Sequence, residues 1–200
     1  EQVMINVYIL CGGPSSEHDI SLRSALNISK NLNEEKYKIK VVYINKEGAY
    51  SESFDKIDTD NEFDLVREVK ENRTKSIANF LDTLSREDYS KTIVIPAVHG
   101  TYGEDGTIQA LLDVIGIAYI GNGLLSSAIC MDKVTSNDIF EKNKLSQAKY
   151  LYTNKDGFDD AFADRCIEEI GLPLIVKPSA NGSSVGVSKV TDKKELLAAG

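Results

Sequence analysis

Apolar, strand-like runs that end in glycine loops, each followed by a segment of helical spacing, constrain the fold of this 200-residue chain most. Residues 3–11 are a β-favouring apolar run, Gly12-Gly13-Pro14 closes it, and residues 20–32 carry apolar residues at helical spacing. Residues 37–44 then predict a second strand. Because parallel strands need a crossover connection, usually a helix, the order predicts an α/β fold with a parallel sheet.

The same order recurs further along the chain. Residues 77–84 predict a helix, residues 92–98 a buried strand, residues 107–115 a helix and residues 117–121 a short strand. Between the two halves of this pattern, residues 51–75 are polar, charged and weakly periodic. That composition indicates a surface excursion rather than a core element.

A second unit begins after Gly121-Asn122-Gly123, where the pattern becomes helical through residue 143. We therefore expect a domain boundary near Gly123, with domains at 1–123 and 124–200. The second domain is predicted to contain a strand at 148–152, a helix at 158–170, a strand at 172–178 and a strand at 185–190. A helix pattern is still starting at Gly200, and Met4 is not the first residue, so a fragment of a longer protein is expected.

Charge and cysteine content exclude several classes of protein. The formal net charge is −8 with acidic and basic residues mixed along the chain, which argues against nucleic-acid binding. Cys11, Cys130 and Cys166 lack metal-like spacing and predict buried, structural thiols in a reducing compartment. Neither a signal sequence nor the roughly 20 apolar residues of a membrane span is found. A soluble, cytoplasmic protein without membrane contact is expected.

The first candidate site is GGPSSEHDIS, residues 12–21, between a strand and the start of a helix. Free backbone N–H groups and the helix dipole favour a carboxylate or phosphate there. Glu17 adds a carboxylate, and the combination suits the ammonium and carboxyl groups of an amino acid. The alternative is that Ser15, Ser16 and Asp19 merely cap the helix.

The second candidate site is HGTYGEDG, residues 99–106, again between a strand and a helix. The His99 imidazole could donate to an anionic group or a phenol, whereas Glu104 and Asp105 could cap the following helix; for Asp105 we prefer the capping role. The alternative for His99 is a structural histidine. A second site in the same crevice favours the functional interpretation.

The third candidate comprises Lys133, Lys177 and the loop GSSVG at 182–186. Lysine ammonium groups bind phosphates, and a glycine and serine loop can fold its donors over a triphosphate. Most lysines are solvated surface residues, but Lys177 follows four apolar residues, so we expect it to emerge from a buried strand. A Walker-type loop is excluded, because the GK[ST] continuation and its helix are absent.

Together, the segments GGPSSEHDISLRSA, HGTYGEDGTIQALLD with YIGNGLLSSAICMDK, and LPLIVKPSANGSSVGVSKV resemble the D-alanine–D-alanine ligase family of the ATP-grasp superfamily. They occur in that family's order and spacing. The resemblance implies a Rossmann-like (pre-ATP-grasp) parallel-sheet domain followed by the first part of an ATP-grasp α+β domain.

The resemblance also implies a reaction and its catalytic residues. The carboxylate of one D-alanine attacks the γ-phosphate of ATP, and the amine of a second D-alanine attacks the acyl phosphate, giving D-Ala-D-Ala for peptidoglycan. Glu17 would hold the first ammonium group, and His99 would lie near the carboxylate and the developing charge. Ser183 would join a hydrogen-bond relay with Glu17 and a tyrosine from a later loop.

For the nucleotide, the resemblance implies that Lys133 and Lys177 contact ATP and its phosphates, while Ser184, Val185 and Gly186 help the loop to close. The acidic ligands of Mg²⁺ (or Mn²⁺) are expected beyond Gly200, so no metal ligand is assigned here. We therefore expect this piece to have no ligase activity by itself. A homodimer would fit the family.

Other interpretations stay open. A relative that makes D-alanyl-D-serine or D-alanyl-D-lactate differs in a selectivity loop that this chain lacks. The pairing of EHDIS with HG..GEDG favours a ligase of D-amino acids over more distant ATP-grasp enzymes. A non-catalytic amino-acid or nucleotide sensor would have no need of Lys177 followed by GSSVG.

Overall fold

The computed structural model describes residues 3–200, which form two compact units, one ending at Ala128 and the other spanning Ile129–Gly200. The helix α4 (Leu124–Met131) runs across this division. The division therefore lies a short way after Gly123, where the sequence placed the boundary. None of the described helices is long and apolar enough to cross a bilayer.

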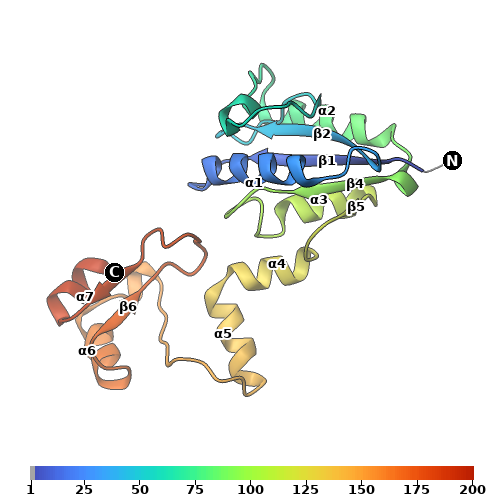
Figure 1. Ribbon diagram of the computed structural model, residues 1–200. Helices are drawn as coiled ribbons and strands as arrows, with labels where there is room; N and C mark the ends of the chain where they lie inside the picture. Colours follow the sequence, from blue (N-terminus) through green and yellow to red (C-terminus); the bar gives the residue numbers. More distant parts are fainter. Residues whose placement is uncertain (1–2) are drawn as a thin grey trace. The chain divides into compact units, whose positions relative to one another are not determined.

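A five-stranded sheet forms the centre of the first unit (Figure 1). Its strands lie in the order β3-β2-β1-β4-β5, and only β3 runs antiparallel to its neighbour. The predicted parallel sheet is therefore confirmed. The strands are β1 (Ile5–Gly12), β2 (Tyr37–Ile44), β3 (Phe54–Asp55), β4 (Thr92–Pro96) and β5 (Ala118–Tyr119).

Both faces of β1 are buried, which explains its continuous apolar run. Val7, Ile9 and Cys11 pack into one cluster with residues of α1, whereas Tyr8 and Leu10 pack into the other with residues of α2 and α3. The predicted crossover helices therefore cover the two sides of the sheet. They are α1 (His18–Asn31), α2 (Arg73–Ser85) and α3 (Thr107–Ile115).

The excursion at 51–75 corrects one expectation. It contains β3, the 3-10 helix η1 (Glu62–Leu65) and the first turn of α2. Leu65 is only 1% exposed and belongs to the cluster on the α1 side of the sheet. The prediction of a segment without a core element was therefore wrong at this residue, because the apolar residues of this charged stretch are only weakly periodic.

The second unit has a small core of its own. Ala163, Cys166, Leu174, Val190 and Leu196 are buried together. The predicted two strands pair antiparallel as β6 (Leu174–Val176) and β7 (Ser188–Val190). Its helices are α5 (Lys133–Lys142), α6 (Asp160–Glu169) and α7 (Lys193–Ala199), with a 3-10 helix η3 (Lys155–Gly157). Another 3-10 helix, η2 (Tyr89–Lys91), precedes β4 in the first unit.

Two predictions in the second unit were wrong. Residues 148–152 are not a strand, because no described strand pairs with this segment. A side-chain contact holds it instead, since the Tyr150 hydroxyl donates to Asp138 at 2.6 Å. The long helix predicted after Gly123 breaks at Asp132, whose carboxylate accepts from the Thr135 amide at 2.7 Å and caps α5.

The three cysteines are free, and two of them are buried as expected. Burial raises the pKa of the Cys11 thiol to about 12, which suits an inert core residue. Cys130 is exposed, so the expectation of a buried thiol was wrong there. Its position on α4 carried no signal that distinguished it from the other two.

Candidate active site

The two glycine-containing loops of the first unit meet where the strand order reverses. From β1 the chain passes through α1 to β2 on one side, whereas β4 lies on the other side of β1. The loops that follow β1 and β4 therefore leave neighbouring carboxyl ends in opposite directions. Open α/β sheets bind their ligands at such a switch point.

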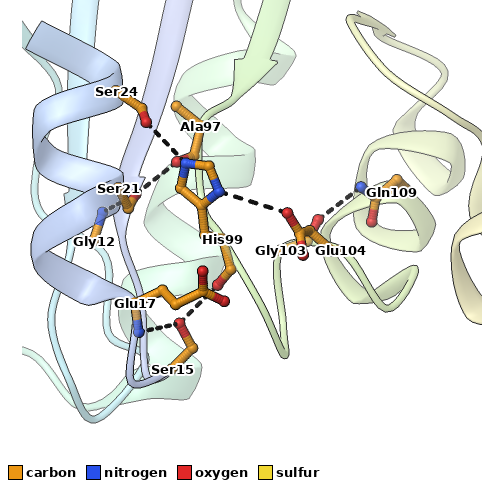
Figure 2. Close-up of polar contacts among 10 residues, drawn as sticks. All are labelled: Gly12, Ser15, Glu17, Ser21, Ser24, Ala97, His99, Gly103, Glu104 and Gln109. Atoms are coloured by element: carbon orange, nitrogen blue, oxygen red, sulfur yellow. Dashed lines mark hydrogen bonds and ion pairs between the residues drawn. The ribbon is translucent and has the colours of Figure 1, made fainter. Parts of the chain in front are cut away.

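Ser21 of α1 joins the ends of β1 and β4 (Figure 2). Its hydroxyl accepts from the Gly12 amide at 2.8 Å and donates to the Ala97 carbonyl at 2.7 Å. Ser21 is fully buried, so neither backbone group has water as an alternative partner. One side chain thus sets the separation of the two loops.

Glu17 lies between the two loops. It is the N-cap residue of α1, but its side chain makes no capping hydrogen bond. Its Oε2 atom lies 2.9 Å from the position that a Cβ on Gly100 would occupy, and Gly100 has a φ of 70°. Glycine at 100 therefore allows the carboxylate to approach the backbone of the second loop.

Ser15 makes a second link between these loops. Its hydroxyl donates to the His99 carbonyl at 2.7 Å and accepts from the Glu17 amide at 3.2 Å. The capping alternative is thus correct in part, since Ser15 binds an amide at the start of α1. The same hydroxyl also fixes the second loop against the first.

His99 lies just beyond the last residue of β4, and its side chain is 32% exposed. Its Nε2 atom is 2.8 Å from the Ser24 hydroxyl, and its Nδ1 atom is 3.5 Å from a Glu104 carboxylate oxygen. Sequence reasoning missed Ser24. The available signal was its position on α1, three residues after Ser21 and therefore on the same face of the helix.

Asp105 satisfies the first amide of α3, as predicted, although the N-cap residue itself is Gly106. Its carboxylate accepts from the Tyr102 amide at 2.7 Å and from the Thr107 amide at 3.0 Å. Partial burial opposes ionisation of this carboxyl, but the amide hydrogen bonds outweigh it and hold its pKa below the ordinary value. The carboxylate thereby supports Tyr102, a non-glycine residue with a φ of 80°.

His18 is a structural histidine that the sequence did not single out. It is 4% exposed, and its ring contacts the Gly13 carbonyl through Nδ1 at 2.7 Å and the Tyr43 hydroxyl through Nε2 at 3.3 Å. Because a carbonyl only accepts, Nδ1 carries the proton. His18 thereby fixes the glycine loop next to Glu17.

In the second unit, Lys133 holds the glycine and serine loop. Its ammonium group donates to the Asn181 carbonyl at 2.6 Å and to the Ser179 carbonyl at 3.3 Å, and its amide also binds Ser179. An ammonium group has three donors, so one remains for a ligand. Lys133 therefore combines a loop contact with an available charge.

The loop itself is built from tight turns. Ser183 and Ser184 have φ angles of 53° and 60°, values that are uncommon outside glycine. Amides of Val185 and Val187 bond back to Gly182 and Ser184. These turns shorten the strand predicted from residue 185. A Cβ on Gly186 would lie 2.8 Å from a Pro178 ring carbon, so glycine allows the loop to fold back on itself.

Lys177 follows the last residue of β6 and is exposed. The expectation that it emerges from a buried strand was only half correct. Leu174 is buried, but Ile175 is 52% exposed, so one face of the two-stranded sheet is open. A continuous apolar run did not distinguish a strand buried on both faces from one buried on a single face.

The structure groups the predicted residues within each unit. Glu17 and His99 lie together in the first unit, and Lys133 contacts the loop that contains Ser183, Ser184, Val185 and Gly186 in the second. A cavity of about 870 Å³ lies elsewhere in the second unit, along α5 and α6, and contains none of the predicted site residues. Residues 3–200 include no cluster of three or more His, Cys, Asp or Glu suited to a metal ion.

Comparisons with known proteins cover both units. The model of the D-ala D-ala ligase N-terminus matches residues 6–122, and that of the D-ala D-ala ligase C-terminus matches residues 139–199. The D-alanine–D-alanine ligase of Finegoldia magna is 38% identical over 96% of this chain, and that of Acetivibrio thermocellus is 40% identical over 95%. The chain spans about half the length of these relatives, 53% and 56%.

Solved structures give the same family. The D-alanine–D-alanine ligase of Coxiella burnetii has a TM-score of 0.77 at 27% identity, over 98% of this chain and 59% of that one. A D-Ala:D-Ser ligase of Enterococcus faecalis has a TM-score of 0.71 at 27% identity, over 98% and 58%. The Bacillus anthracis ligase complexed with ATP has a TM-score of 0.67 at 28% identity, over 97% and 53%. The chain belongs to the D-alanine–D-alanine ligase family.

Proposed function

We propose that this chain supplies the site for the first D-alanine, and part of the nucleotide site, of an ATP-dependent D-alanine–D-alanine ligase. The observation that carries the proposal is the Glu17 carboxylate, which lies against the Gly100 backbone at the switch point of the sheet. An amino acid needs an anion for its ammonium group and donors for its carboxylate. Glu17 provides the first, and His99 and the start of α1 provide the second.

The roles of the catalytic residues follow from this chemistry. Glu17 accepts hydrogen bonds from the ammonium group of the first D-alanine. His99 donates to its carboxylate and to the charge that develops there. Ser183, on the loop of the second unit, is assigned a catalytic role through its hydroxyl. Ser15 and Ser21 keep Glu17 and His99 at a fixed separation, because their hydroxyls bond the backbone of the two loops.

The residues of the second unit fit a nucleotide. Lys177 is an exposed cation beside a loop of serine and glycine, and Lys133 retains a donor after binding two loop carbonyls. Ser184, Val185 and Gly186 lie in turns that can close over phosphates. ATP supplies the phosphoryl group that activates the carboxylate, and a related structure is complexed with ATP. We assign Mg²⁺ (or Mn²⁺) to acidic ligands outside this chain.

The same proposal covers the setting of the enzyme. We place the domain boundary near Gly123 and expect a cytoplasmic homodimer that makes D-Ala-D-Ala for peptidoglycan. Of the alternatives for the second substrate, D-serine and D-lactate, a comparison supports D-serine, because the chain is also similar to a D-Ala:D-Ser ligase at 27% identity. The 200-residue chain alone is expected to be inactive, since phosphoryl transfer depends on the metal for much of its rate.

The test is phosphate release by a protein in which this chain continues past Gly200. With Mg-ATP and D-alanine alone, release is expected, and Glu17→Gln should abolish most of it. Glu34→Gln, which alters an exposed partner of Lys56, is the matched control and should retain activity. Release only with D-alanine plus D-serine would support the alternative. Absence of release with any D-amino acid would overturn the proposal.

A further inference from the structure

Glu17 differs from the N-cap residues of four other helices. Asn72, Asp132, Asp159 and Asp192 begin α2, α5, α6 and α7 in an extended conformation, and the side chain of each accepts from an amide of its own helix. Glu17 instead has a φ of −96° and a ψ of 18°, and its side chain makes no such bond. These angles lie in the sparsely populated bridge region, where many active-site residues are found. The fold must therefore hold Glu17 away from the usual N-cap conformation.

The ring of His18 closes the turn that carries Glu17. Its Nδ1 atom donates to the Gly13 carbonyl at 2.7 Å, and its amide donates to the Ser15 carbonyl at 3.3 Å. Both bonds join the residue after Glu17 to residues before it. Because His18 and Gly13 are both buried, water is not an alternative partner for the carbonyl. The imidazole therefore fixes the backbone on either side of Glu17.

A residue of β2 holds the His18 ring in turn. The Tyr43 hydroxyl lies 3.3 Å from Nε2, and the two rings pack edge to face with their centroids 5.5 Å apart. Since Nδ1 carries the proton of a neutral ring, Nε2 accepts from the hydroxyl. A Cβ on Gly12 would lie 3.0 Å from a His18 ring carbon and 3.1 Å from a Tyr43 ring carbon. Glycine at 12 thus makes room for both rings at the end of β1.

We propose that His18 is a positioning residue, whose bond to Gly13 keeps the Glu17 carboxylate between the two loops instead of at the end of its own helix. The Glu17 side chain extends toward the loop after β4, where Oε2 lies 2.9 Å from the position of a Cβ on Gly100 (Figure 2). Without the His18 bond, Glu17 can relax to the extended conformation of an ordinary N-cap, in which its carboxylate accepts from amides of α1. That carboxylate would then be withdrawn from a ligand. The identity of the ligand, the ammonium group of an amino acid, rests on the proposed function.

Substitutions at residue 18 separate the hydrogen bond from the volume of the ring. His18→Asn places an N–H group near the position of Nδ1, so it can still donate to the Gly13 carbonyl. His18→Gln places its N–H group near the position of Nε2 instead, and His18→Leu has no donor. If the ring merely filled space, glutamine would be the better replacement, because its volume is closer to that of histidine.

The backbone ¹³Cα and ¹³Cβ chemical shifts of Glu17 report its ψ angle in the 200-residue chain. His18→Gln and His18→Leu should move these shifts toward the values of an extended residue, whereas His18→Asn should leave them near those of the wild type. Tyr43→Phe should move them in the same direction by a smaller amount, and it provides the test where a His18 variant fails to fold. Tyr8→Phe is the matched control, because it removes the bond of another buried tyrosine, to Glu87 at 2.6 Å, outside both loops.

Activity gives the second measurement, in a protein in which this chain continues past Gly200. His18→Gln should raise KM for D-alanine about tenfold with a smaller change in kcat, whereas His18→Asn should stay within about threefold of the wild type. Tyr8→Phe should leave KM unchanged.

Unchanged Glu17 shifts in the variants that lose the Gly13 bond, or a KM in His18→Asn as high as in His18→Gln, would overturn the inference. A wild-type protein without D-alanine activity would instead contradict the proposed function, and the chemical shifts would still decide whether His18 sets the conformation of Glu17.

Discussion

The loop after β1 and the loop after β6 are both rich in glycine and serine, but their serines are used differently. In the first unit, Ser15 and Ser21 bond backbone groups of two separate loops. In the second unit, Ser183 and Ser184 are exposed and lie in left-handed turns of their own loop. We therefore expect the proposed amino-acid site to be preformed by the fold and the proposed nucleotide loop to change shape around a ligand.

The largest effect should come from a methyl group where the preformed loops have no space. A Cβ on Gly103 would lie 2.1 Å from the Val98 carbonyl oxygen, so Gly103→Ala must displace the backbone. We expect a loss of about 3 kcal/mol in the free energy of unfolding of the first unit, measured by urea denaturation and circular dichroism.

Two glycines make this comparison quantitative. Gly123→Ala, whose Cβ would only touch the Tyr119 hydroxyl at 3.9 Å, should cost less than about 1 kcal/mol. Gly186→Ala would place a non-glycine residue at a φ of 73° and 2.8 and 3.3 Å from two Pro178 ring carbons, but it meets no backbone atom, so it should destabilise its unit less than Gly103→Ala does its own. Equal losses at residues 103 and 186 would remove the distinction between a rigid and an adaptable loop.

Ser21→Ala should have the next largest effect. It leaves the Gly12 amide and the Ala97 carbonyl buried without their partner, at a cost of roughly 2 kcal/mol. Ser29→Ala, on the same helix and equally buried, loses only a bond to its own turn and should be nearly neutral. Similar unfolding curves for the two variants would show that Ser21 does not join the loops.

Lys133→Met tests the loop after β6. Loss of the bonds to Ser179 and Asn181 should increase hydrogen exchange across residues 179–186 by about tenfold, with less than about 1 kcal/mol change in global stability. Lys177→Met, at an exposed position beside the same loop, is the control and should leave exchange unchanged. Unchanged exchange in Lys133→Met would mean that its bonds do not restrain the loop.

The smallest expected effect depends on pH and concerns Asp105. Amide hydrogen bonds hold its pKa below the ordinary value, so its contribution to stability is present above the unfolded-state pKa of about 3.9 and is lost as pH falls through the folded-state pKa. Asp105→Asn should therefore be less stable than wild type at neutral pH, and the difference in melting temperature should shrink below about pH 4. A difference independent of pH would exclude this linkage.

The periodic elements of the fold were predictable, and isolated contacts were not. The apolar runs at β1, β2 and β4 specified a parallel sheet because strands buried on both faces need continuous apolar sequence. Leu65 escaped detection because the apolar residues around it are only weakly periodic. Residues 148–152 were predicted as a strand from composition, but a strand also requires a partner, which composition does not supply.

The candidate site shows the same limit. Motifs identified Glu17 and His99 because each follows a strand and precedes a helix. The contact between Ser24 and His99 joins residues 75 positions apart, and only the packing of α1 beside β4 brings them together. Asp105 was predictable because capping is a local interaction, whereas Ser21 and Ser24 needed the tertiary structure to acquire a role.

The short edge strand β3 has a practical consequence for protein engineering. Phe54 pairs with Val41 on one side of the excursion, and Leu65 is anchored in the core on the other. The chain between these two anchors lies at the edge of the sheet opposite β5, and its residues Asp58, Asp60 and Asn61 are exposed. Added length there costs only the slowly growing entropy of a longer loop. A fluorophore-bearing peptide or an affinity tag inserted at this position would label the protein while leaving the strands that carry the candidate-site loops untouched.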